Sequence, residues 1–93
     1  MKIGLFGINM GHADASVSLP PLVAKLETAG FESVWTGEHV IIPEDYASRY
    51  PYNNSGKLGI PAETPFADPL ITLSFIAAHS TKLRLGTGIN ILP

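Results

Sequence analysis

The chain of 93 residues has no cysteine and only 15 % charged residues. Without cysteine it has neither a disulfide framework nor a thiolate metal site. Its six lysines and arginines are scattered, so no basic cluster indicates a nucleic-acid or anionic-membrane partner. No apolar stretch is as long as a transmembrane helix, and the glycine-rich start lacks a signal-peptide cleavage site. The cytoplasm is therefore the expected location.

Apolar residues make up 45 % of the chain, which is enough for the core of one small domain. The apolar run at 2–8 predicts a first strand that is buried on both faces. A helix is expected to follow with Ser18 as its N-cap, because Pro20 and Pro21 are tolerated only in a first turn. Gly30 is the expected residue after that helix, and the segment ESVWTG then predicts a second strand.

Residues 40–67 are rich in proline and tyrosine and show no sustained periodicity, so they predict a long loop. A loop of this length in a compact domain is usually functional or disordered. Its side chains Tyr46, Arg49, Tyr50 and Tyr52 could close over an aromatic ligand, or they could simply pin the loop to itself.

The last third of the chain predicts a second helix and a third strand. Asp68 and Pro69 are the expected N-cap and first residue of the helix. The helical sequence LITLSFIAAHS is apolar nearly all round, which predicts that the helix is well buried. The stretch LRLGTGINI predicts the final strand, and Trp35 is expected to pack in the core between a helix and the second strand.

The predicted order is β-α-β-loop-α-β, which indicates an α/β fold with parallel strands. Ligands of such folds bind at the carboxyl ends of the strands. That rule selects the segments NMGH, GEHVIIP and GTGIN, which follow or end the three predicted strands and lie on one rim.

Glu38 and His39 are the sharpest candidates for chemistry on that rim. A histidine at the end of a strand can take or give a proton near neutral pH, and the neighbouring carboxylate could tune its pKa. The alternative is a polar pair that caps nearby backbone. Adjacent side chains in a strand point to opposite faces, so both reach one pocket only if the strand has ended near Gly37. His12 could reach the same rim, but no metal-ligand spacing supports a metal site, and His79 is expected to cap its helix.

A glycine such as Gly88 weakens a strand unless the backbone must bend or another group must come close to it. The segment GTG lacks the full dinucleotide fingerprint, and no helix follows it. Gly88 therefore predicts a bulge or the close approach of a flat ligand, with a packing glycine beside a helix as the alternative.

The blocks GFESVWTGEHVIIP and DPLITLSFIAAHSTKLRLGTGINILP resemble the luciferase-like monooxygenase superfamily, and most of all its predicted coenzyme F420-dependent oxidoreductases. The resemblance implies that residues 1–93 are the N-terminal part of a (β/α)8 TIM barrel, with three strands and two main helices, and that 40–67 is its active-site-side loop. A whole barrel needs about 250 residues. The chain is therefore expected to be a truncated piece that is marginal alone and forms a homo-oligomer.

The resemblance also implies an activity, namely hydride transfer between F420 and a small organic substrate. His39 would donate or accept the proton and contact the cofactor, with Glu38 beside it. Gly88 and Ile89 match a strand bulge that backs the ring system and often carries a cis peptide bond. An FMN-dependent monooxygenase is the alternative within the superfamily, and a non-catalytic α/β remnant or assembly module is the alternative of another class.

Overall fold

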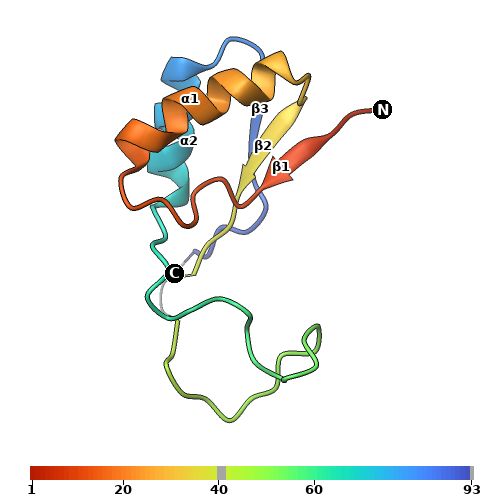
Figure 1. Cartoon of the computed structure of the whole chain (residues 1–93), viewed down its shortest axis with the longest axis vertical. Helices are drawn as coiled ribbons and strands as arrows, with labels where there is room; N and C mark the ends of the chain where they lie inside the picture. The colour runs from red at the N-terminus through yellow and green to blue at the C-terminus, as the bar shows by residue number, and fades with distance from the viewer. Residues whose placement is uncertain (40–41, 93) are drawn as a thin grey trace.

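The computed structural model describes residues 1–39 and 42–92, and it shows a small α/β domain. Three parallel strands form an open sheet in the order β1-β2-β3, together with two helices (Figure 1). The elements in chain order are β1 (Gly4–Phe6), α1 (Ala15–Thr28), β2 (Ser33–Thr36), α2 (Pro69–His79) and β3 (Arg84–Thr87). The predicted order of three parallel strands and two helices is confirmed.

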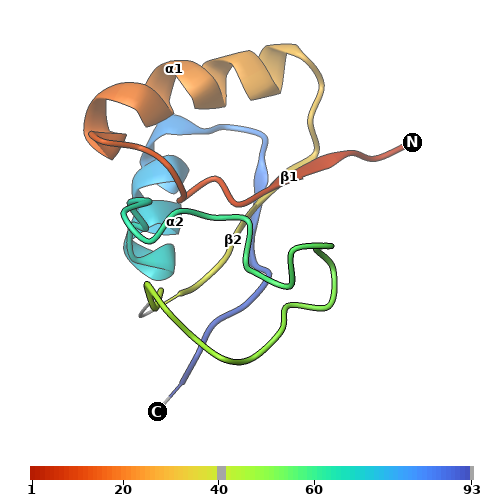
Figure 2. The ribbon, with the colours of Figure 1, turned by 60° about the horizontal axis from the view of Figure 1, so that its bottom comes forward.

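The expected loop at 40–67 is also present, although its first two residues lie outside the described part of the chain. Residues 42–67 form no helix or strand and extend beyond the carboxyl ends of the strands, at the bottom of Figure 1. This extension contributes to the elongated dimensions of 44 × 29 × 25 Å. Figure 2 shows that the amino terminus lies at the end of β1 that points away from α2.

Helix α1 begins earlier than its prolines suggested. Its N-cap is Asp14, whose Oδ1 accepts hydrogen bonds from Ser16 N at 3.0 Å and Ser16 Oγ at 2.6 Å. The Ser16 hydroxyl in particular lowers the pKa of Asp14. The prediction that Ser18 caps the helix is wrong, and Pro20 and Pro21 lie in its second turn. That placement is tolerated because the carbonyls that lose their donors belong to two exposed residues of the first turn, which water can reach.

Helix α1 ends as predicted. Gly30 has φ +85°, which glycine adopts without the cost that a Cβ imposes. Phe31 N donates to Leu26 O at 3.0 Å, and Gly30 N donates to Glu27 O at 3.1 Å. These two bonds form a Schellman motif, which turns the chain from the helix into β2.

Helix α2 also begins as predicted, because the side chain of Asp68 accepts a hydrogen bond from Ile71 N at 2.8 Å. The expected burial of the whole helix is wrong. Ile76 is buried, but Leu70 is 54 % exposed and Ile71 is 72 % exposed. Its apolar composition therefore did not reveal which face packs inward. Within the described part of the chain, neither helix is both long and apolar enough to cross a membrane.

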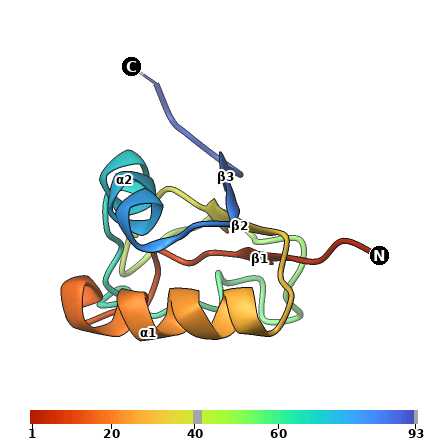
Figure 3. The ribbon, with the colours of Figure 1, turned by 90° about the horizontal axis from the view of Figure 1, so that it is seen from above.

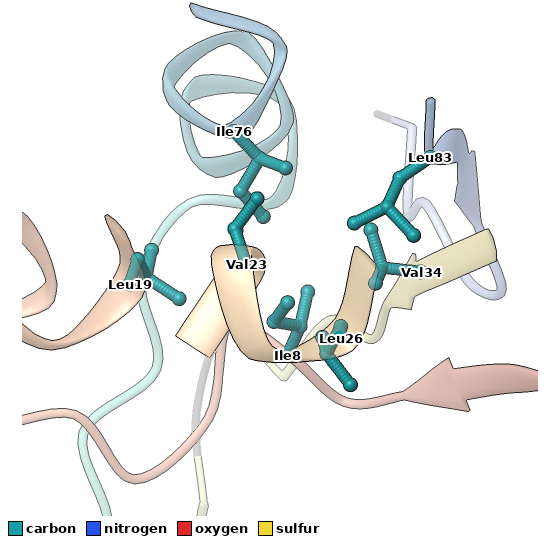
Figure 4. Packing of buried hydrophobic residues seen from close by; sticks show 7 residues of the cluster. All are labelled: Ile8, Leu19, Val23, Leu26, Val34, Ile76 and Leu83. Carbon is teal, nitrogen blue, oxygen red and sulfur yellow. The ribbon is translucent and has the colours of Figure 1, made fainter. Parts of the chain in front are cut away.

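One small core lies between the helices and one face of the sheet. Figure 3 shows α1 and α2 on the same side of the sheet, and Figure 4 shows the buried side chains meeting there. The buried apolar residues are Ile8, Leu19, Val23, Leu26, Val34, Ile76 and Leu83. Burial of such side chains is the main force that holds small domains together.

The opposite face of the sheet is not covered by a helix. Strand alternation turns Val34 toward the helices and Trp35 away from them, so Trp35 is 41 % exposed. Phe6 lies beside it in the register and is 57 % exposed. The predictions that Trp35 is a core residue and that β1 is buried on both faces are therefore wrong. The expectation that the chain forms a homo-oligomer stays a prediction.

Candidate functional site

The carboxyl ends of the three strands bring together segments that are distant in the sequence. β1 leads to Asn9, β2 leads to Glu38 and His39, and β3 leads to Gly88. Phe66, just before α2, joins them through an antiparallel bridge with Met10. The predicted rim is therefore present in the fold.

Asn9 holds this rim together, although sequence reasoning gave it no role. Its side chain is 1 % exposed. The Nδ2 group donates to Gly37 O at 2.7 Å and to Ala67 O at 2.9 Å, and Oδ1 accepts from Gly37 N at 3.1 Å. Asn9 therefore pairs with the backbone of Gly37 as a neighbouring strand would, and it ties the end of β2 to the entrance of α2. The only sequence signal was an amide residue directly after the first strand.

Glu38 is half-buried and accepts a hydrogen bond from the backbone N–H of Ile91 through Oε2. This contact ties the chain after β2 to the segment that follows β3. Of the two roles that the sequence left open, the capping of backbone is therefore present for Glu38. The carboxylate has a second oxygen, Oε1, that can also accept hydrogen bonds.

His39 is exposed, and its ring forms a T-shaped contact with the ring of Phe66, with the ring centroids 5.8 Å apart. No hydrogen bond joins its imidazole to another residue of the described segments. His39 and Glu38 border one hollow of about 290 Å³ together with Phe66 and Asp68. The condition for this shared pocket is met, because β2 ends at Thr36 and the alternation of side chains ends with it.

The other two histidines make contacts away from this hollow. His12 lies with Nδ1 2.8 Å from Ser18 Oγ and Nε2 2.9 Å from Ile8 O, so it fixes the loop between β1 and α1. His79 Nδ1 donates to Phe75 O at 2.8 Å, which confirms its capping role at the end of α2. Among the described residues, no group of three or more histidine or acidic side chains gathers as metal ligands would.

Gly88 is needed for a close approach, but the approaching group is a side chain of this protein. A Cβ at this position would lie 2.3 Å from Cε2 of Phe6 and 3.3 Å from the carbonyl oxygen of Thr36. Gly88 N donates to Thr36 O at 2.8 Å, directly after the last paired residues of the ladder, Thr36 and Thr87.

The peptide bond between Gly88 and Ile89 is trans, so the expected cis bond is not found. The strand pairing ends at Thr36 and Thr87, so the expected bulge at Gly88 and Ile89 stays a prediction. Ile89 is 52 % exposed and offers an apolar side chain on the same rim.

Comparison of the chain with models of protein families, with curated proteins and with solved structures found no match.

Proposed function

We propose that this chain forms the proton-handling rim of a flavin- or deazaflavin-dependent oxidoreductase, with F420 as the coenzyme and FMN as the alternative. The observation that carries the proposal is the position of His39. Its imidazole is exposed at the carboxyl end of β2 and borders the same hollow as Glu38. Ligands of parallel α/β folds bind at this end of the strands.

The residues around the hollow fit the ring end of such a coenzyme. The aromatic ring of Phe66 gives a flat apolar surface, and His39 forms a T-shaped contact with it. Gly88 would act only indirectly, because the space beside it is occupied by Phe6. When bound, the coenzyme supplies hydride transfer, and the protein positions it and manages the accompanying proton.

The two polar residues of the pair have separable tasks. His39 takes or gives the proton at one ring nitrogen, because an imidazole exchanges protons near neutral pH. Glu38 holds the backbone of Ile91 and places a carboxylate beside the hollow. A glutamine at position 38 keeps an oxygen that can accept from Ile91 and removes the charge, so Glu38→Gln tests the charge alone.

Binding of F420 and of FMN to the full chain can be measured by fluorescence polarisation. Oxidation of the reduced coenzyme by a panel of enones, quinones and aldehydes then gives a rate. We expect His39→Gln to change binding of F420 by less than about threefold and to lower the rate by roughly 10²-fold or more, as for loss of a general acid or base. The control is His79→Gln, which removes an imidazole from the end of α2 and should change neither.

Equal losses of binding and rate in His39→Gln would show that His39 is structural. Preference for FMN over F420 would favour the monooxygenase alternative. A folded chain that binds neither coenzyme would favour the non-catalytic α/β module.

A further inference from the structure

A second hollow borders His39 and is formed by the long loop. Its volume is about 280 Å³, close to the lower end of ligand pockets at roughly 300 Å³. Apolar walls come from Pro43, Pro51 and Leu58. A space of this size accommodates a ligand with a single substituted ring, and its walls favour an apolar body.

The loop that builds this hollow is held by its own hydrogen bonds. Tyr50 N donates to Gly56 O at 2.6 Å, and Gly56 N donates to Asn53 O at 2.8 Å. Asn53 Oδ1 also accepts from Ser55 N at 3.0 Å. Gly56 is buried with φ +72°, a conformation that favours glycine. The hollow therefore belongs to a folded turn.

Arg49 is the charged residue of the lining, and the turn positions it. A Cβ on Gly56 would lie 3.0 Å from Arg49 Nε and 3.6 Å from its Cγ, so the arginine side chain runs across the glycine. No ion pair joins Arg49 to another residue in the ranges 1–39 and 42–92. The planar fork of its guanidinium matches a carboxylate.

Tyr46 forms a fixed aromatic wall of the hollow. Its hydroxyl oxygen accepts a hydrogen bond from Leu58 N, and Lys57 Nζ donates to its carbonyl oxygen at 2.7 Å. The same Nζ lies 4.4 Å from the centre of the Tyr46 ring. Tyr50 is a second aromatic wall, and Tyr52 packs against it with ring centroids 5.7 Å apart. Rings held in this way favour an aromatic ligand over an aliphatic one.

The cationic side chains at this hollow favour an anionic ligand. Arg49 lines it, and Lys57 sits over one of its aromatic walls. His39 and Ser48 add groups that can donate hydrogen bonds. Among the described residues that line it, none is acidic.

We infer that this hollow is a binding site for small aromatic carboxylates. The ring packs against Tyr46 and Tyr50, and the carboxylate binds the guanidinium of Arg49. The site needs no coenzyme, so it goes beyond the proposed oxidoreductase function. Only the further step, in which such a ligand is the substrate beside His39, rests on that function.

The test uses the full ¹⁵N-labelled chain without coenzyme and follows amide NMR shifts during titration with three probes. Benzoate has the ring and the charge, benzamide lacks the charge, and cyclohexanecarboxylate lacks the aromatic ring. We expect benzoate to shift amides within 42–58 with a dissociation constant of about 1 mM, in line with its small size. Both other probes should bind at least about fivefold more weakly.

Two arginine variants form the matched pair. Arg49→Gln should weaken benzoate roughly tenfold or more, as for loss of a charged hydrogen-bond donor. Arg84→Gln removes an exposed arginine of β3 and should leave the titration unchanged. Unchanged amide shifts outside 42–58 show that each variant is folded. Arg49→Lys keeps the charge and should recover part of the affinity.

The inference is overturned by any of three results. The first is equal binding of benzoate and benzamide. The second is an equal effect of Arg49→Gln and Arg84→Gln. The third is a folded chain whose loop amides do not shift at about 10 mM benzoate, ten times the expected constant. None of these results depends on F420 or FMN, so failure here is distinct from failure of the proposed function.

Discussion

The polar groups at the two ends of the parallel strands are arranged differently. We call these ends the amino edge and the carboxyl edge. At the amino edge, the carboxylate of Glu27 accepts hydrogen bonds from Ser80 Oγ at 2.6 Å, Thr81 N at 2.8 Å and Lys82 N at 2.9 Å. These bonds hold the turn between α2 and β3 against the last turn of α1. The Ser80 hydroxyl, followed by the Lys82 and Thr81 amides, lowers the pKa of Glu27 to about 2.

At the carboxyl edge, hydrogen bonds also bind backbone groups, but a titratable side chain is exposed. Asn9 satisfies the backbone of Gly37. His39, one residue beyond Glu38, makes only an aromatic contact among the described residues and borders two hollows. At the amino edge the bonds hold parts of the fold together, whereas the carboxyl edge combines such bonds with the exposed side chain of His39. Substitution of a residue that holds the fold, such as Asn9 or Glu27, should therefore lower stability at either edge, whereas substitution of His39 should not.

The largest effect on stability is expected when the hydrogen bonds of Asn9, the clamp at the carboxyl edge, are removed. Asn9→Ala leaves the N–H and C=O of Gly37 without their buried partner, together with one bond to Ala67. We expect a loss of about 2–4 kcal/mol in the free energy of unfolding, measured by urea denaturation. Asn54→Ala, at an exposed position of the loop, should change it by less than about 0.5 kcal/mol. Similar values for the two variants would contradict the clamp.

The next effect tests the packing of Phe6 on Gly88. Gly88→Ala places a Cβ 2.3 Å from the Phe6 ring, so the ring must move, at a cost of about 1–2 kcal/mol. The added Phe6→Ala change should remove most of this cost in a double-mutant cycle. Gly59→Ala is the control, because its Cβ would meet only Asn53 Nδ2 at an ordinary 3.4 Å. A cycle that shows no coupling would contradict the contact.

A smaller effect should appear at the amino edge as a dependence on pH. The folded pKa of Glu27 is about 2, below its ordinary 4.5, so its stabilising contribution is present above about pH 4.5. It is lost as the pH falls toward 2. Because Glu27 is accessible to solvent, salt should weaken the effect.

Urea denaturation at about pH 6 and about pH 3 measures this contribution. Glu27→Gln should unfold at lower urea than the parent at the higher pH and should lose less stability on acidification. Glu63→Gln, at an exposed position of the loop, should keep the acid-dependent loss of the parent. The same acid-dependent loss in Glu27→Gln and in the parent would contradict the role of Glu27.

The smallest effect on stability is expected at His39. His39 is exposed, and its ring forms no hydrogen bond with another described residue. His39→Gln should therefore change the free energy of unfolding by less than about 0.5 kcal/mol. Thermal and urea unfolding measure this directly. A loss larger than about 1 kcal/mol would place His39 with the stabilising residues and against a binding role.

Local signals in the sequence predicted the ends of the elements well where the cap is a short-range contact. Gly30 and Asp68 were identified because a C′ glycine and an Asp-Pro pair act within one helical turn. Ser18 was wrong as a cap because Asp14, four residues earlier, offers the same kind of side-chain oxygen. The two prolines alone did not show whether Asp14 or Ser18 is the N-cap.

The site was predictable only in part. The rule for parallel strands placed Glu38 and His39 on one rim, and the structure has them there. Asn9 was missed because its partners lie 28 and 58 residues away. Trp35 was placed in the core because composition does not reveal which face of a sheet the helices cover.

The sequence by itself determined the order of strands and helices, their parallel arrangement and the rim at which polar residues gather. These follow from periodicity, caps and chain connectivity, which act over short distances. Only the tertiary structure decided that Phe6 fills the space at Gly88, that Glu38 holds Ile91 and that the loop encloses a hollow beside His39. Those contacts join residues that are distant in the chain, and their geometry depends on how the whole domain packs.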